Sequence, residues 1–334
     1  MQKNILVTGG LGYIGSHLSL DLLKENYTVI IIDNLVNSSV TVLDKIIKLS
    51  NKQVSFYQTD ITDLKSLDLI FEENNIYCII HLAALKSIPE SKNNKIKYYD
   101  TNVNGTINIL KCMKKYKVNN LIFSSTASLY CINNEIPFKE DSNRCSTNVY
   151  SHSKLICENI LELSFLKHNF NLISLRYFNP IGNEPTGILK ENLFGSDTNL
   201  VPSILKSINN KSIFNIYGSD YNTEDGTCVR DFIHVLDVTS GHISALKLIE
   251  NSHINRLLFL NLGTGVGTSV LKFIKTFEKV NNIKIKYKFS HKRIEDQPIS
   301  YADVSNTLKV LNWTSKYSLE SMCKDSYKSS ILKD

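Results

Sequence analysis

The chain has 334 residues, and 42% of them are apolar, which is enough for a sizeable buried core in one large domain or two domains of ordinary size. Its net charge of +6 comes from basic residues that are scattered singly, whereas nucleic-acid binders more often gather them in one arm or stripe. Composition therefore argues against a nucleic-acid partner and is compatible with an anionic small-molecule substrate. The sequence contains no run of about 18 apolar residues, so we expect no transmembrane helix and no membrane partner.

The seven cysteines are an odd number, and their spacing shows neither a CxxC nor a CxxxH pattern. This predicts free thiols in a reducing compartment and no metal site. Residues 1–4 lead directly into an apolar segment without a cleavage site, which predicts no signal peptide. Together these features predict a cytoplasmic protein.

Up to about residue 180, the chain alternates short apolar runs with amphipathic stretches. We expect strands at residues 5–8, 28–33, 54–58, 78–81, 121–124 and 172–176, and helices at residues 13–26, 64–73, 100–116 and 150–168. Strands that alternate with helices are typical of a parallel sheet covered by helices on both faces. The sequence therefore predicts an α/β protein with a doubly wound Rossmann sheet.

Beyond residue 180 the pattern loosens, and Gly, Pro, Asn and Asp interrupt it at residues 179–180, 184–187 and 218–220. This composition predicts a smaller C-terminal α+β lobe. We therefore expect two domains, 1–180 and 181–334, with some of the C-terminal chain crossing back to the first domain.

A glycine-rich turn, GGLGYIG at residues 9–15, directly follows the first strand and opens the first helix. Its glycines allow a close approach of the backbone to a pyrophosphate, and the helix N-terminus offers N–H groups and the positive end of its dipole. Asp33 ends the second strand 18 residues after Gly15, where a carboxylate accepts hydrogen bonds from adenosine ribose hydroxyls and repels a 2′-phosphate. The pattern predicts NAD rather than NADP as the cofactor.

Tyr150 and Lys154 form a YxxxK pair at the start of an expected helix, where the i,i+4 spacing puts both side chains on one face. We expect the lysine ammonium to favour the phenolate and to lower the pKa of Tyr150, which suits a general base near neutral pH. Thr126 ends the sequence Ser124-Ser125-Thr126 after the fifth strand, where its hydroxyl can bind a substrate hydroxyl and relay its proton. Active sites of open α/β sheets lie at the carboxyl ends of the strands, where these residues fall.

The GxxGxxG turn, the Ser/Thr residue and the YxxxK pair together resemble the extended short-chain dehydrogenase/reductase superfamily. Longer stretches resemble the UDP-glucose 4-epimerases in particular, from the first strand to about Trp313: VTGGLGYIGSH at 7–17, YYDTNVNGT at 98–106, LRYFNP at 175–180, TEDGTCVRDFIHV at 223–235 and NLGTGVGTSV at 261–270. The resemblance implies an NAD-dependent isomerase of galactose and nucleotide-sugar metabolism, which interconverts UDP-glucose and UDP-galactose.

The resemblance also implies a mechanism, in which Tyr150 takes the proton of the sugar 4-hydroxyl with Thr126 bridging, while tightly held NAD accepts hydride from C4. The 4-keto sugar then turns about its pyrophosphate link, and hydride returns to its other face. Lys154 holds the nicotinamide ribose and tunes Tyr150.

By the same resemblance, the cofactor site is lined by Gly9, Gly12, Tyr13, Ile14, Gly15, Asp33, Asn34, Asn37, Ser38, Asp60, Ile61, Leu82, Ala83, Ala84, Lys86, Thr101, Tyr150, Lys154 and Phe178. The UDP-sugar site is lined by Thr126, Asn179, Asn199, Tyr217, Arg230, Arg293, Asp296 and Ser300. Two arginines suit a pyrophosphate, because guanidinium binds phosphate oxygens bidentately. The chain departs from the family pattern at residues 186–198 and at Glu295, which replaces a glycine.

Ser300 occupies the position that, in the family, gates the pocket around the sugar 2-substituent. A bulky tyrosine there accompanies hexose-only enzymes, and small residues accompany acceptance of N-acetylated sugars. The resemblance therefore implies activity on UDP-N-acetylglucosamine and UDP-N-acetylgalactosamine as well.

Three other functions compete with this reading. A 4,6-dehydratase needs an acid and a base beside Thr126, but Ala127 and Ser128 follow it. A non-enzymatic NAD-binding sensor would usually lack the YxxxK pair. A UDP-glucuronate 4-epimerase, or another enzyme acting on uronic acids, needs cations around the sugar C6, and the sequence leaves this alternative open.

The family tends to form homodimers through a four-helix bundle, which the helices at 100–116 and 150–168 would supply, and Ile156, Ile160 and Leu163 recur at helical spacing on the second. We interpret His17, His81 and His234 as hydrogen-bonded structural residues rather than as acids or bases.

Overall fold

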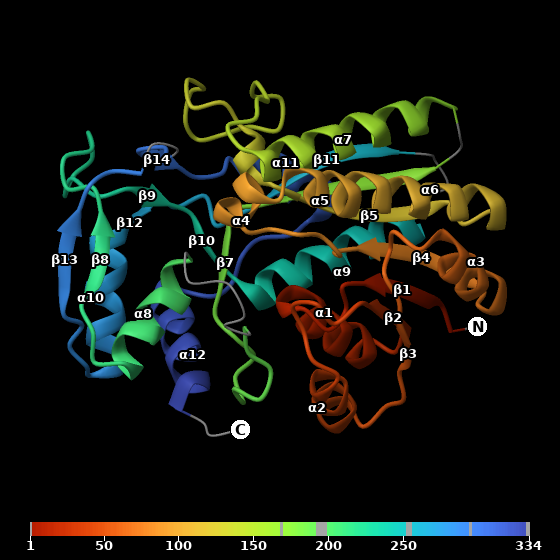
Figure 1. The fold of residues 1–334 in the computed structure, drawn as a ribbon, viewed down its shortest axis with the longest axis horizontal. Helices are drawn as coiled ribbons and strands as arrows, with labels where there is room; N and C mark the ends of the chain where they lie inside the picture. The colour runs from red at the N-terminus through yellow and green to blue at the C-terminus, as the bar shows by residue number, and fades with distance from the viewer. Residues whose placement is uncertain (1, 168–169, 192–198, 252–255, 294–295, 332–334) are drawn as a thin grey trace. The chain divides into compact units, whose positions relative to one another are not determined.

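The computed structural model describes residues 2–167, 170–191, 199–251, 256–293 and 296–331 (Figure 1). The chain divides into two compact units. Unit 1 comprises residues 1–129, 144–176 and 239–260, and unit 2 comprises residues 130–143, 177–238 and 261–334. Segment 239–260 thus joins unit 1 from beyond residue 180, and segment 130–143 joins unit 2 from before it.

Unit 1 is built around a seven-stranded sheet of order β11-β6-β5-β4-β1-β2-β3. Its strands are β1 (Asn4–Thr8), β2 (Thr28–Asp33), β3 (Ser55–Gln58), β4 (Ile76–His81), β5 (Asn120–Thr126), β6 (Asn171–Tyr177) and β11 (Leu257–Leu262). The neighbouring pairs from β3 through β2, β1 and β4 to β5 are all parallel. From β1 the chain adds β2 and β3 on one side of the sheet, and from β4 onward it adds strands on the other side of β1. This change in the order of the parallel strands confirms the predicted doubly wound α/β fold.

The helical segments of this part of the chain are α1 (Tyr13–Lys24), α2 (Thr41–Ser50), α3 (Leu64–Glu73), α4 (Ile88–Asn93), α5 (Lys95–Tyr99), η1 (Asp100–Asn104), α6 (Gly105–Tyr116), η2 (Ala127–Leu129), α7 (Val149–Lys167) and α9 (Val235–Asn251). One core is formed by alternate strand residues such as Leu6, Ile79 and Leu121 against α3, α6 and α7. Figure 1 shows α1 and α9 on the other face, where Thr239 of α9 donates to Asp21 of α1 at 2.6 Å. Both faces are therefore covered, which explains why the strands are apolar without alternation.

The helix expected at residues 100–116 begins as one turn of π-helix, η1, before it continues as α6. Asn102 within this turn is buried and makes two hydrogen bonds with the backbone of Leu85 and one with the hydroxyl of Ser153. A π-turn changes the direction of a side chain relative to a regular helix, and such turns are frequent at functional sites. The spacing of apolar residues in the sequence does not predict this π-helical turn.

Unit 2 holds smaller sheets and its own core, as expected for an α+β lobe. Its elements are β7 (Asn179–Ile181), α8 (Leu200–Asn209), β8 (Phe214–Tyr217), β9 (Val229–Arg230), β10 (Phe232–His234), β12 (Thr268–Ser269), α10 (Val270–Asn281), β13 (Tyr287–Ser290), β14 (Ile299–Ser300), α11 (Ser305–Leu311) and α12 (Leu319–Ile331). The sheets are β10-β7, β12-β9-β14 and β13-β8. Phe273, Ile274 and Phe277 of α10 pack with Met322 and Cys323 of α12 in this core.

The expectation of free thiols is wrong for two cysteines, because Cys131 and Cys145 are disulfide-bonded. Backbone hydrogen bonds from Cys131 to Asn143 and from Cys145 to Leu129 fold the chain back on itself here, which the spacing alone did not reveal. The other five cysteines are free and buried. Within the described ranges, no helix combines the length and apolarity needed to cross a membrane.

The three singled-out histidines are buried and hydrogen-bonded, as interpreted from the sequence. His81 is the most constrained: its Nδ1 lies 2.7 Å from the Thr8 hydroxyl and its Nε2 lies 3.1 Å from the Thr106 hydroxyl. Burial, with a smaller effect from the Lys154 charge, lowers the pKa of His81 to about 3. The ring is therefore neutral in the folded protein at physiological pH.

Because the His81 pKa is depressed on folding, its contribution to stability is complete above the ordinary pKa of 6.5 and is lost as pH falls toward about 3. We expect the free energy of unfolding to fall by up to about 1.4 kcal/mol per pH unit in this window from His81 alone. Urea unfolding of the wild type and of His81→Gln between pH 7 and pH 5 measures it. Identical pH slopes for the two proteins would contradict the prediction.

Candidate active site

The glycine turn after β1 has the geometry that a phosphate-binding turn requires. Gly9 has φ +68°, and its N–H donates to the carbonyl of Ile32 at 2.7 Å. A Cβ on Gly15 would stand 2.1 Å from the carbonyl oxygen of Gly9, so α1 can begin here only with glycine. Gly12 occupies the N-cap position and has no side chain to cap the helix. The turn therefore suits an anionic ligand at the N-terminus of α1.

Asp33 at the end of β2 is buried and anchors the loop that follows it. One carboxylate oxygen accepts from Leu35 N at 2.9 Å and from the Ser38 hydroxyl at 2.8 Å, and the other accepts from Leu11 N at 3.0 Å. A carboxylate has about four acceptor positions, so Oδ2 retains capacity for a ligand hydroxyl. The residues present thus fit the expected ribose contact, whereas Asn37 in the same loop is exposed.

Asp60 and Ile61 follow β3 and lie beside this loop. Asp60 accepts from the Asn34 amide at 2.7 Å and from the Thr62 backbone N–H at 2.8 Å. Ile61 is buried against Gly105, where an added Cβ would stand 2.4 Å from the isoleucine Cδ1. These contacts bring the loops after β2 and β3 together at one edge of the sheet.

The segment after β4 passes directly over the glycine turn. Leu82 N donates to Thr8 O at 3.1 Å, Ala83 N donates to the Thr8 hydroxyl at 3.2 Å, and the Lys86 ammonium lies 5.9 Å from the Tyr13 ring centroid. Thr101 lies in η1 next to Asn102, the residue that ties this segment to α7. The expected cofactor residues of the glycine turn and of the segment after β4, with Ile14 and Ala84 among them, therefore lie at the switch point between β1 and β4, whereas Asp33 ends β2 and Asp60 and Ile61 lie in the loop after β3.

Thr126, Tyr150 and Lys154 lie together in unit 1. Thr126 ends β5 and Tyr150 lies in the first turn of α7, near enough for the Thr126 hydroxyl to lower the pKa of Tyr150. The Lys154 ammonium, one turn later, donates to the Ser124 carbonyl at 2.7 Å and lies 4.6 Å from the Phe123 ring centroid. The parallel sheet thus brings a hydroxyl, a phenol and an ammonium to the carboxyl end of one strand.

The expected lowering of the Tyr150 pKa is wrong for the protein's own groups. Burial raises the pKa of Tyr150 to about 12 and outweighs the hydrogen bond with Thr126, which lowers it. Burial also lowers the pKa of Lys154 to about 8, against the raising effects of Cys157 and Glu158. The i,i+4 spacing placed both side chains correctly, but the ammonium is engaged by the Ser124 carbonyl.

Two polar residues near these groups were not predicted as site residues. Ser128 places its hydroxyl 2.9 Å from the Thr126 hydroxyl and donates its N–H to it at 3.2 Å. Asn102 makes the three bonds described above. Asn102 lies within the YYDTNVNGT stretch, and only the buried, π-helical geometry shows what it does.

The residues expected to bind UDP lie in unit 2 and form two groups. The Arg293 guanidinium carbon lies 3.9 Å from the ring centroid of Tyr217. Arg230 donates to the Gln297 carbonyl at 2.7 Å and lies 3.4 Å from a carboxylate oxygen of Asp296. Ser300 pairs with Arg230 in the β14–β9 register.

Asp231, beside Arg230, organises this part of unit 2 although the sequence did not single it out. Its buried carboxylate accepts from Thr264 N at 2.8 Å, Gly265 N at 3.0 Å and Ala302 N at 3.2 Å. Burial raises its pKa against these hydrogen bonds. The bonds hold the ends of β9 and β14, and with them Arg230 and Ser300.

The other residues expected in the site belong to neither of these two groups. Asn179 opens β7 and donates its N–H to Asp231 O, and Asn199 is the N-cap residue of α8. Phe178 is buried in unit 2, with its ring centroid 6.4 Å from that of Tyr130. Glu295 and most of segment 186–198, where the sequence departs from the family pattern, lie outside the described residues.

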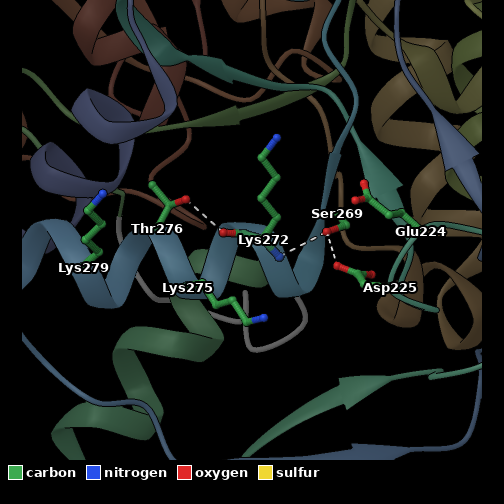
Figure 2. Close-up of a pocket in the computed structure, with 7 residues that line it drawn as sticks. All are labelled: Glu224, Asp225, Ser269, Lys272, Lys275, Thr276 and Lys279. Atoms are coloured by element: carbon green, nitrogen blue, oxygen red, sulfur yellow. Dashed lines mark hydrogen bonds between the residues drawn. The ribbon is translucent and has the colours of Figure 1, made fainter.

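A surface cavity of about 350 Å³ lies along α10 and is lined by residues from outside the expected site (Figure 2): Glu224, Asp225, Ser269, Lys272, Lys275, Thr276 and Lys279. Ser269 caps α10 by accepting from Lys272 N at 3.1 Å and donates to Asp225. These bonds satisfy the cap within the protein. In the part of the chain that the structure describes, no cluster of three His, Cys, Asp or Glu side chains could hold a metal ion.

Comparison with known proteins agrees with this geometry. The family described as GDP-mannose 4,6 dehydratase matches residues 6–326. UDP-glucose 4-epimerase of Dictyostelium discoideum is 41% identical over 98% of this chain and 96% of its own, and that of Bacillus subtilis is 40% identical over 97% and 96%.

Solved structures give the same assignment. A UDP-glucose-4-epimerase from Stenotrophomonas maltophila, with bound NAD and formylated UDP-arabinopyranose, matches with a TM-score of 0.95 and 36% identity over 98% of both chains. A UDP-glucose 4-epimerase from Bifidobacterium longum, in complex with NAD+ and UDP, matches with a TM-score of 0.93 and 38% identity over 98% of both. The chain therefore belongs to the UDP-glucose 4-epimerase family.

Proposed function

We propose that this chain is an NAD-dependent UDP-glucose 4-epimerase, which interconverts UDP-glucose and UDP-galactose through a transient 4-keto sugar. The arrangement of Thr126, Tyr150 and Lys154 at the carboxyl end of β5 carries the proposal. It lies in the same unit as a glycine turn and an Asp33 that fit a dinucleotide. Membership of the epimerase family selects this reaction among those that the scaffold supports.

Tyr150 takes the proton of the sugar 4-hydroxyl, and Thr126, whose hydroxyl lowers the pKa of Tyr150, bridges the two. When bound, NAD supplies the hydride acceptor and donor for C4, and its oxidised nicotinamide carries a positive charge. Because burial raises the pKa of Tyr150 to about 12, the phenol needs such an added positive charge to act as a base near neutral pH. The charged form of Lys154 works in the same direction.

The UDP moiety is held by unit 2. Arg230 and Arg293 provide guanidinium groups for the pyrophosphate, and the Tyr217 ring lies against Arg293. Asn179, Asn199 and Asp296 supply further polar groups. Binding through the pyrophosphate leaves the sugar free to turn, which the inversion of C4 requires.

A dehydratase reaction, which the family description names, does not fit this chain. Ala127 has no carboxylate, and Ser128 directs its hydroxyl to Thr126 at 2.9 Å. The curated relatives quoted above are UDP-glucose 4-epimerases, so a UDP-glucuronate substrate has no support from them.

Purified protein incubated with UDP-galactose, without added NAD, tests the proposal. We expect conversion to UDP-glucose, resolved by anion-exchange chromatography, because the cofactor stays bound during turnover. Tyr150→Phe keeps the ring but lacks the acid and base hydroxyl, and we expect its rate to fall by on the order of 10²-fold or more. No conversion by the wild type, even after NAD is supplied, would contradict the proposal.

We further propose that Ser300 determines which substituents on C2 of the sugar the site accepts. The register places Ser300 beside Arg230, and the Tyr301 ring lies against Gly267. A serine side chain leaves room for an acetamido group, so we expect the wild type to convert UDP-N-acetylgalactosamine as well.

Ser300→Tyr should lose most turnover of UDP-N-acetylgalactosamine by steric exclusion and keep turnover of UDP-galactose. The ratio of kcat/KM for the two substrates measures the change, with Tyr301→Phe as the control. A wild type that converts only UDP-galactose would refute the expectation.

We further propose a homodimer formed by α7 with the helices around residues 95–116. Leu163 and Leu166 of α7 are 62% and 77% exposed, and Ile96 of α5, a helix in contact with α7, is 86% exposed, so these helices carry apolar side chains that a partner would cover. Ile156 and Ile160 are partly buried, so the exposed part of the expected stripe is its C-terminal end.

Leu163→Glu combined with Leu166→Glu should convert a dimer to a monomer, because two carboxylates would be buried at the interface. Light scattering of the purified protein measures the mass. Leu69→Glu on α3, at a site that is 59% exposed, is the matched control and should remain dimeric. A monomeric wild type would overturn this proposal.

We propose a cytoplasmic location, supported by the five free and buried cysteines. In such a compartment the disulfide bonds of Cys131 and Cys145 would be exposed to cellular reductants.

A further inference from the structure

Glu158 of α7 is a fully buried carboxylate with an unusually complete set of donors. Arg176 contributes Nε at 3.0 Å and a terminal nitrogen at 2.8 Å, and Arg144 contributes one at 3.1 Å. The hydroxyls of Ser125 and Ser174 donate to its Oε1 at 2.6 and 2.9 Å. Burial would raise the pKa of Glu158, but the bonds and charge of Arg176 hold it below its usual value.

This buried ion pair lies next to the catalytic groups. Glu158 follows Lys154 by one helical turn, so the two side chains leave the same face of α7. Lys154 donates to the carbonyl of Ser124, and Glu158 accepts from the hydroxyl of Ser125. The helix is thus hydrogen-bonded to two consecutive residues of β5, and the next residue along the strand is Thr126.

Two hydrogen bonds from one helix to consecutive strand residues, here Ser124 and Ser125, fix both the position and the rotation of the strand end relative to the helix. The helix that provides them also carries Tyr150 in its first turn. The bond from Ser125 to Glu158 therefore bears directly on how the Thr126 hydroxyl meets the Tyr150 phenol.

Burial of the Glu158 charge does not depend on Ser125. Without the Ser125 hydroxyl, Oε1 would still accept from Ser174 and from Arg176 Nε, and Oε2 from both arginines. Ser174 makes the same kind of bond to the same oxygen, with the same 1% exposure, but it lies on β6. Of the two serines, only Ser125 adjoins Thr126.

We propose that Ser125 is a positioning residue of the catalytic site, whose hydrogen bond to Glu158 aligns Thr126 with Tyr150 for proton transfer. This inference rests on the proposed epimerase function. Ser174, in contrast, secures Glu158 without acting on the reacting groups.

Ser125→Ala and Ser174→Ala in the full-length holoenzyme separate alignment from stability. Each variant loses one buried hydroxyl bond to Glu158, so we expect similar decreases in melting temperature of a few degrees. Ser125→Ala should lower kcat for UDP-galactose on the order of tenfold or more, with KM within about twofold, because sub-ångström misplacement of reacting groups slows chemistry rather than binding. Ser174→Ala should keep the wild-type kcat.

Ser125→Cys is a second variant of nearly the same size whose thiol is a weaker donor, and its kcat should fall between those of the wild type and Ser125→Ala. It decides the question if Ser125→Ala does not fold. Unchanged kcat in the Ser125 variants, equal losses in Ser125→Ala and Ser174→Ala, or a change confined to KM would each overturn the inference.

A crystal structure of Ser125→Ala keeps this inference separate from the function on which it rests. An inactive wild type would defeat the proposed function, but the alignment of Thr126 with Tyr150 could still be read from the structure. We expect the distance between the Thr126 and Tyr150 hydroxyl oxygens to increase in Ser125→Ala and to stay at its wild-type value in Ser174→Ala. An unchanged distance in Ser125→Ala would overturn the inference.

Discussion

The parallel pairing of β1 with β4 is the constraint on which the rest of unit 1 depends. The register places Thr8 beside His81, so both strands end at the same level. The chain leaving β1 and the chain leaving β4 must then pass in contact, and a Cβ on Gly9 would stand 2.8 Å from Ala83 N. Glycine is required at this crossing by packing, before any ligand is considered. The same crossing directs the N-terminus of α1 into the crevice at the switch point.

Buried polar groups stabilise the arrangement around this crevice. Thr8, His81 and Thr106 form a chain of hydrogen bonds beneath it, and Asn102 joins the segment after β4 to α7. Each is costly to bury unless all of its partners are present, so the network favours one arrangement of strands and helices over its alternatives. This network therefore fixes the positions of the strands and helices that carry the catalytic groups.

The same environment sets the chemistry of the site. Burial raises the pKa of Tyr150 to about 12 and lowers that of Lys154 to about 8, so near neutral pH the phenol stays neutral while the lysine stays mostly charged. A phenol that resists ionisation is a weak base until an added positive charge is bound. The protein thus supplies position, and the cofactor charge completes the base, which would restrict proton abstraction to the form with oxidised cofactor.

Much of the fold was predictable because its signals are local. Runs of β-branched residues such as Val29–Ile32 marked the strands to within one or two residues, and the glycine spacing marked the turn before α1. The bonds of Asn102 and Asp231 were not predictable, because they join residues that only the folded chain brings together, and the spacing of the cysteines did not show that Cys131 is disulfide-bonded. The direction of the Tyr150 pKa shift failed for a related reason: spacing places Lys154 on the same helix face but does not show that Ser124 holds its ammonium.

In the proposed mechanism Tyr150 handles only the hydroxyl proton, while the hydrogen on C4 leaves and returns without exchanging with water. UDP-galactose that carries deuterium at C4 of the sugar tests this directly when it is incubated with the protein in ordinary water. Mass spectrometry of the UDP-glucose formed should show the deuterium retained at C4. Loss of the label to solvent would contradict the account, since it would mean that C4 is inverted by proton exchange.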